Sequence, residues 1–236
     1  MKKLFIVAVL SCTSLIFAQQ DPSFTVTYKL KTLLDINTLP DSIQESGFNM
    51  EVHLKLRNQM EAISFQLKVN DSISEYKISD ELNTFVQSDN WLLEATKKNR
   101  WFVDDATYIQ QTYLLEQEYL IAKASYQQNW ILEEGTKTIL GYPCKRASRN
   151  RDDLGNTSII AWYTEDIPYQ FGPVGNHGLP GLILEILQNE KMVYYATEID
   201  FEGDVYAFKP STGYKISQED FNNKLNFNIE SFSKKN

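Results

Sequence analysis

The residues from Gly175 to Ile186, GNHGLPGLILEI, combine side-chain types and spacings that could do chemistry. Three glycines and a proline fall within seven residues, His177 lies among them, and an apolar run containing Glu185 follows. A glycine-rich loop binds phosphate when it reads G-x-x-x-x-G-K-[ST] before a helix or G-x-G-x-x-G after a strand. Neither spacing occurs here, so the segment is expected to be a shaped corner that leads into a strand.

Cys144 and His177 are a second candidate for chemistry. A thiol beside an imidazole can supply the nucleophile and base of a hydrolase, and the same pair could form half of a four-ligand zinc site. The segment GYPCKRA, however, places Cys144 on a strand, where a lone cysteine usually packs as a small apolar residue. We therefore expect packing and predict no metal site and no cofactor. Hydrolysis by Cys144 or by dispersed carboxylates, and metal handling by Cys144 and His177, are the alternatives.

Several aromatic residues lie close to these candidates in the sequence. They are Tyr142, Trp162, Tyr163, Tyr169 and Phe171. The simpler interpretation is a hydrophobic core and its rim. The alternative is a wall that faces a sugar or a lipid inside the concavity of a curved sheet.

Alternation of apolar and polar residues indicates the strands that must position these side chains. It is clear over 24–30, 50–57 and 63–70, so each is predicted to be a half-buried antiparallel strand. On this interpretation His53 faces solvent. The segment 91–132 is less regular and is predicted to form strands broken by polar turns, with a helix near 113–123 as the alternative.

The second half of the chain returns to a strand pattern. Four strands are expected between 136 and 202, with a turn at 152–156 and a hairpin tip at 188–191. The run Leu182–Leu184 is apolar on both parities, which predicts a central strand covered on both faces.

A helix is expected at the C-terminus. Ser217 and Asp220 resemble a helix N-cap, and Phe221, Leu225 and Ile229 follow with helical spacing. The predicted fold class is mainly β: a long curved antiparallel meander of about eight to eleven strands, a half-barrel or sandwich, with a C-terminal helix.

The six letters GLPGLI, Gly178 to Ile183, resemble the signature of the GLPGLI family of exported bacterial proteins. Flanking blocks at 139–147, 161–168 and 171–173 resemble other recurrent blocks of that family. The resemblance implies export from a Gram-negative bacterium and an outer-membrane or envelope partner rather than a particular activity. The chain is also similar to the bowl-shaped, non-catalytic N-terminal module of some secreted glycan-cleaving enzymes.

Two short motifs suggest covalent modification. Asp41-Ser42-Ile43 and Asp71-Ser72-Ile73 resemble the O-glycosylation acceptor of bacteria that carry the GLPGLI family. Ser42 and Ser72 are therefore possible O-glycosylation sites, and an ordinary turn is the alternative at each.

The first residues have the pattern of a secretory signal peptide. Lys2 and Lys3 precede an apolar stretch, and Ala18 offers a cleavage position before polar residues. We expect a signal peptide at 1–18 and a single β-rich domain of the GLPGLI family at 19–236, in the periplasm or secreted. A lipoprotein attached through Cys12 is the less favoured alternative. The apolar stretch is too short for a comfortable transmembrane span.

Charge excludes one class of partner. The formal net charge is −8, and removal of the two signal-peptide lysines would bring it to about −10. A chain this acidic, without a basic run, is not expected to bind nucleic acid through phosphates.

The expected function is therefore that of a non-enzymatic envelope protein that binds a glycan, an apolar ligand or a protein partner in the concave face of its sheet. The candidate binding or structural residues are Gly178, Leu179, Pro180, Gly181, Leu182, Ile183, Tyr142, Cys144, Trp162, Tyr163 and His177.

Overall fold

The computed structural model describes residues 23–33, 50–79, 98–104, 107–114, 117–124, 127–151, 157–202 and 208–233. The predicted signal peptide, Cys12, Ser42 and the turn at 152–156 lie outside the described residues. None of the helices in the described part is long and apolar enough to cross a membrane.

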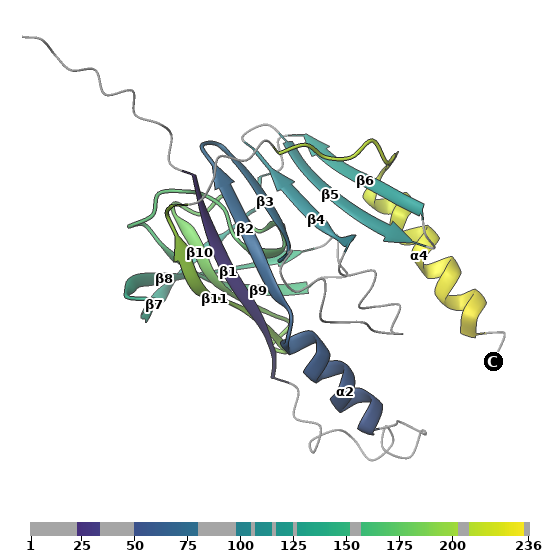
Figure 1. Cartoon of the computed structure of the whole chain (residues 1–236), viewed down its shortest axis with the longest axis horizontal. Helices are drawn as coiled ribbons and strands as arrows, with labels where there is room; N and C mark the ends of the chain where they lie inside the picture. The colour runs from purple at the N-terminus through teal and green to yellow at the C-terminus, as the bar shows by residue number, and fades with distance from the viewer. Residues whose placement is uncertain are drawn as a thin grey trace, which may run out of the picture.

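Twelve strands of the described chain form one sheet (Figure 1). They are β1 (Ser23–Thr32), β2 (Ser64–Asn70), β3 (Ile73–Ile78), β4 (Arg100–Val103), β5 (Thr107–Leu114), β6 (Gln117–Ala124), β7 (Ile131–Ile139), β8 (Tyr142–Arg151), β9 (Thr157–Thr164), β10 (Leu182–Gln188), β11 (Met192–Asp200) and β12 (Tyr214–Ile216). Their order in the sheet is β12-β6-β5-β4-β3-β2-β1-β11-β10-β9-β8-β7.

The sheet is open and largely antiparallel, which confirms the predicted fold class. β12 lies parallel to β6, whereas the other strand pairs are antiparallel. The described strands exceed the expected eight to eleven by one, and they form one sheet rather than a two-layer sandwich. In Figure 1 the strand direction changes between β1–β6 and β7–β8, as the right-handed twist of a large sheet requires.

The core follows the predicted alternation in β1 and β2. Val26, Tyr28 and Leu30 are buried on β1, and Phe65 and Leu67 are buried on β2. Tyr28 is paired directly with Phe65, so both strands present their apolar residues to the same face. The strands predicted at 24–30 and 63–70 are confirmed.

The strand predicted at 50–57 is wrong, because Met50–Glu61 forms helix α2. The sequence MEVHLKLRNQME is rich in Met, Leu, Glu, Lys, Arg and Gln, which favour the helix through their small loss of side-chain entropy. Alternation over eight residues did not outweigh that propensity. His53 therefore lies on a helix rather than on the polar face of a strand.

Strands occupy the described part of the middle segment. β4, β5 and β6 run consecutively from residue 100 to residue 124, so the strand interpretation of this segment is confirmed and the alternative helix near 113–123 is wrong. Between residues 131 and 200 the structure has five strands instead of four. The difference arises at Leu140 and Gly141, whose positive φ angles of 51° and 86° make a tight turn between β7 and β8.

The C-terminal helix α4 (Gln218–Ser233) begins where the sequence predicts. The Ser217 hydroxyl accepts a hydrogen bond from the Asp220 backbone N–H at 3.0 Å and donates one to the Asp220 carboxylate at 2.7 Å. Phe221, buried on the first turn, contacts Tyr119 of β6 with 5.6 Å between the ring centroids. The helix is thereby fixed to the β6 end of the sheet.

Strand β10 is central, as expected. Leu182, Ile183 and Leu184 have no exposed surface, and β10 is flanked by β9 and β11. The segment 165–181, which includes the 3-10 turn η4 (Pro173–Gly175), joins β9 to β10 and is here called the corner loop.

Candidate functional site

The corner loop meets two hairpin tips at one end of the sheet. β3 pairs with β4 so that Ser74 lies opposite Val103, which brings the β2–β3 and β4–β5 tips together. The turn η4 contacts β3, β4 and β10, so the loop packs back against the sheet near these tips. Three segments far apart in the sequence therefore meet at one rim.

Two glycines let the corner loop approach its neighbours. Gly181 has φ +155°, and a Cβ there would lie 2.0 Å from the carbonyl oxygen of Thr164. Gly175 has φ +70°, and a Cβ there would lie 2.7 Å from the rings of Trp101 and Tyr108. Any larger side chain would force the loop away from β9 at one point and from β4 and β5 at the other.

His177 is held by Gln128. The Gln128 side-chain oxygen accepts a hydrogen bond from the His177 backbone N–H at 3.0 Å, and its amide nitrogen donates to the Gly175 carbonyl at 2.8 Å. The same amide nitrogen lies 2.9 Å from His177 Nδ1. The Trp130 indole N–H donates to the His177 carbonyl at 2.7 Å. These contacts fix the backbone of the loop and the position of the imidazole.

A buried arginine, Arg149, is hydrogen-bonded to the corner loop. The Arg149 guanidinium donates to the side-chain oxygen of buried Asn176 at 2.7 Å and lies 4.9 Å from the centroid of the Trp130 ring. Asn176 in turn donates to the carbonyl of Pro173 at 2.8 Å. A charge is tolerated here because hydrogen bonds and an aromatic face replace its hydration.

A pocket of about 730 Å³ opens between the loop and the hairpin tips. Its lining comes from the two hairpin tips, the segment 127–129 and the corner loop. The lining residues are Asp71, Ser72, Val103, Asp104, Thr107, Tyr108, Gln127, Gln128, Asn129, Pro168, Tyr169, Gln170, Phe171, His177 and Gly178. The lining combines amides, hydroxyls and two carboxylates with aromatic rings, of which Tyr108 and Phe171 are buried and Tyr169 is half-buried.

The rings of the pocket are held rigidly. Tyr108 is buried and stacks with His177 at 5.9 Å between ring centroids. Tyr169 contacts Phe24 of β1 edge to face at 4.9 Å. These contacts fix the orientation of both rings.

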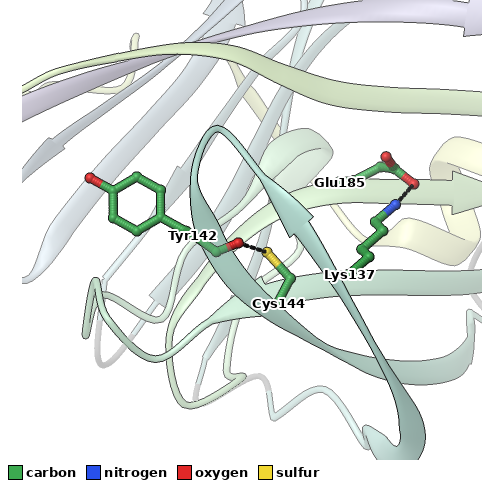
Figure 2. A network of polar contacts seen from close by, with 4 residues as sticks. All are labelled: Lys137, Tyr142, Cys144 and Glu185. Atoms are coloured by element: carbon green, nitrogen blue, oxygen red, sulfur yellow. Dashed lines mark hydrogen bonds and ion pairs between the residues drawn. The ribbon is translucent and has the colours of Figure 1, made fainter.

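A second polar network lies on β7, β8 and β10 (Figure 2). The Lys137 ammonium donates to the Glu185 carboxylate at 2.6 Å and lies 4.6 Å from the centroid of the Trp162 ring. The Cys144 thiol donates to the carbonyl of Tyr142 at 3.5 Å. The carboxylate seen in the apolar run of the sequence is therefore paired with a lysine.

Cys144 has the properties of a packing residue. It is 1% exposed and belongs to the main hydrophobic cluster. Burial raises the pKa of its thiol, which disfavours the thiolate that a nucleophile or metal ligand needs. Cys144 donates to Tyr142 in the network of Figure 2, whereas His177 contacts Gln128, so the contacts described for the two residues belong to separate networks. Within the described part of the chain, no three His, Cys, Asp or Glu side chains are grouped for a metal ion.

Some of the other candidate residues line the pocket, some are buried in the core, and Pro180 and Trp162 are in neither group. His177, Gly178 and Ser72 line the pocket. Leu179, Leu182, Ile183 and Tyr163 are buried, Pro180 is exposed, and Trp162 is half-buried.

Asp104, Tyr108 and Gln128 are not among the residues that the sequence indicates. Each belongs to a segment without a recognisable motif, and only the turn formers at 71–72 and 104 could have suggested a rim of hairpin tips.

Together, the fold and the pocket define a mainly-β module with a pocket of largely polar lining at one end of an open sheet. The family model described as the N-glycanase peptide N-terminal domain, PNGase_F-II_N, matches residues 63–221. Because this match covers more than half of the chain, the protein belongs to that family.

Solved structures agree with this fold. The structure of PNGF-II in the P21 space group matches with a TM-score of 0.54 and 15% identity, covering 86% of this chain and 32% of that one. The structure of PNGF-II in the C2 space group gives a TM-score of 0.53 and 14% identity, with the same coverage. The chain therefore spans about a third of the length of these proteins. No curated protein matches the sequence.

The assignment to the GLPGLI family is wrong, since the matching family is that of the PNGase F-II N-terminal domain. The six letters that suggested it belong to the corner of the loop and the buried start of β10, so they reflect backbone and packing demands. The second similarity, to the N-terminal module of secreted glycan-cleaving enzymes, agrees with the family found.

Proposed function

We propose that the chain is a non-enzymatic carbohydrate-binding module and that the pocket between the corner loop and the hairpin tips holds the sugar. The observation that carries the proposal is the lining of the pocket, where amide and carboxylate groups accompany the half-buried ring of Tyr169 and the buried rings of Tyr108 and Phe171 lie behind the surface. Sugars present hydroxyl groups at their edges and C–H groups on their faces. Amides and carboxylates match the first, and the negative face of an aromatic ring matches the second.

The family supports the same ligand class. Its name refers to an N-glycanase, and the matching domain is the N-terminal one. A separate module that holds a glycan needs no acid, base or nucleophile of its own, which fits the buried thiol of Cys144. The predicted signal peptide at 1–18 supports the further proposal that the protein is exported to the periplasm or the medium, where glycans occur.

Binding to free oligosaccharides tests the proposal directly. Isothermal titration of the protein with a panel of released N-glycans is expected to identify at least one ligand. Asn129→Ala and Gln170→Ala remove exposed amides of the pocket and should each weaken that binding about 5- to 10-fold, the usual effect of one lost polar contact of about 1 kcal/mol.

A matched control is available on the C-terminal helix. Asn223→Ala removes an exposed amide of α4, outside the pocket lining, and should leave the affinity unchanged. If no member of the panel binds, or if the three variants weaken binding equally, the pocket is not the glycan site.

A further inference from the structure

The charged side chains among the described lining residues of the pocket are both acidic. Asp71 and Asp104 line it, and none of the described lining residues is Lys or Arg. The remaining polar groups of the lining are amides, hydroxyls and the imidazole of His177. Lys123 lies 5.8 Å from the centroid of the Tyr108 ring and is not a lining residue of the pocket.

The two carboxylates stand on neighbouring hairpin tips. Asp104 is fixed, because its carboxylate accepts hydrogen bonds from the Thr107 backbone N–H at 2.6 Å and from the Thr107 hydroxyl at 2.8 Å. Asp71 is exposed at the β2–β3 tip. Since β3 and β4 are paired, both charges lie on the same rim as the amides that would face a sugar.

From this arrangement we infer that the pocket selects uncharged sugars and rejects sugars that carry a carboxylate. The inference rests on the proposed function and specifies its ligand class. Carboxylates accept hydrogen bonds from sugar hydroxyls, so they favour a neutral ligand. A sialic or uronic acid would bring a negative charge to the same rim without a basic residue in the lining to compensate it, and like charges a few ångströms apart repel appreciably at a protein surface.

A matched pair of ligands tests this selectivity. The probes are one sialylated N-glycan and the same glycan after enzymatic removal of its sialic acids, titrated at low ionic strength. The desialylated glycan is expected to bind about tenfold tighter or more. The ratio should shrink when the titration is repeated in about 0.5 M NaCl, because salt screens charges near the surface.

Substitution of the carboxylates should remove the discrimination. The double variant Asp71→Asn, Asp104→Asn keeps the size of both side chains, and an asparagine at 104 can still accept the hydrogen bond from the Thr107 N–H. Its affinity ratio for the two glycans should fall to about two or less. The control is Glu190→Gln, Glu219→Gln, which makes the same change of net charge at exposed positions of the β10–β11 turn and α4.

The outcomes separate the inference from the function on which it rests. Equal or tighter binding of the sialylated glycan overturns the inference and leaves carbohydrate binding intact. An equal loss of discrimination in the control also overturns it, because net charge would then be responsible rather than the pocket. If neither glycan binds, the proposed function fails and the selectivity fails with it.

Discussion

Two buried tyrosines show how the surroundings of a hydroxyl group determine its contribution to the stability of the fold. Tyr28 and Tyr76 are 0% and 1% exposed and meet edge to face at 6.0 Å. The Tyr28 hydroxyl donates to the carbonyl of Ile183 at 2.6 Å, which links β1 to the first part of β10. The Tyr76 hydroxyl has no hydrogen-bond partner among the described residues.

Removing these two hydroxyls should have different effects. Tyr28→Phe loses a hydrogen bond and leaves a buried carbonyl with one partner fewer, so the free energy of unfolding should fall by about 1–2 kcal/mol. Tyr76→Phe removes a buried polar atom that has no protein partner, so stability should stay within about 0.5 kcal/mol or rise. Urea unfolding at neutral pH measures both, and equal losses would contradict the assignment.

At the scale of elements, the corner loop tolerates fewer substitutions than the strands that it joins. The Arg149 and Gln128 networks hold it from two sides, and Gly181 sets the angle at which the chain enters β10. The strands tolerate many apolar side chains of similar volume. At Gly181, by contrast, the Thr164 carbonyl leaves no space for any side chain.

Alanine substitutions at Gly178 and Gly181 of the corner loop distinguish the cost of a steric clash from the cost of backbone strain. Gly181→Ala combines a clash at 2.0 Å with φ +155° and should cost about 3 kcal/mol or more. Gly178→Ala has φ +86° but nothing within 4 Å of the new Cβ, so only the left-handed backbone is penalised, by about 1 kcal/mol. Denaturation midpoints of the two purified variants give the comparison. Similar losses would show that contact with Thr164 does not control this corner.

At the scale of the whole molecule, the described strands form one open sheet with a core and two edge strands, β12 and β7. The edge strand β7 exposes Ile131 and Leu132 by 65% and 62%. Its pairing with β8 is interrupted between Glu133 and Thr136, an irregularity of the kind that disfavours pairing of an edge strand with other chains. The core side of the same sheet buries tyrosines rather than only aliphatic residues.

These tyrosines should make the fold sensitive to alkali. Burial raises the pKa values of Tyr28 and Tyr76 far above the ordinary value of a tyrosine. Burial also raises the pKa of Tyr194, to about 12. Well below pH 10 the hydroxyls are protonated in both the folded and the unfolded chain, so stability is unaffected. Above pH 10 the unfolded chain ionises first, and each tyrosine lowers the free energy of unfolding by up to about 1.4 kcal/mol per pH unit.

Unfolding titrations between pH 9 and pH 11.5 at constant ionic strength measure this loss. Tyr76→Phe is expected to fold normally at neutral pH. The decrease of its free energy of unfolding with pH should be smaller than that of the unmodified protein by the contribution of one tyrosine, up to about 1.4 kcal/mol per pH unit. An identical slope in the variant would show that ionisation of Tyr76 is not linked to unfolding.

Short-range patterns in the sequence determined much of the architecture. Alternation located β1 and β2, the Ser217–Asp220 cap located the start of α4, and the run Leu182–Leu184 identified a strand buried on both faces. Each feature depends on residues within a few positions of one another, because strand and helix periods express themselves locally. Where two local signals competed, as at 50–57, alternation was the weaker one. O-glycosylation of Ser72 stays a prediction. Ser72 lines the pocket, and the intact mass of the native protein would show whether it is modified.

The pocket was decided only by the tertiary structure. Gln128 reaches His177 across 49 positions of the sequence, and Tyr28 reaches Ile183 across 155. No local pattern encodes such pairs, since they depend on the order of strands in the sheet and on the direction in which the corner loop folds back. The sequence could therefore indicate His177 and the glycine-rich corner as candidates. It could not show that Asp71, Asp104 and Gln128 would share a rim with them, because hydrogen bonding and packing over long separations bring those side chains together.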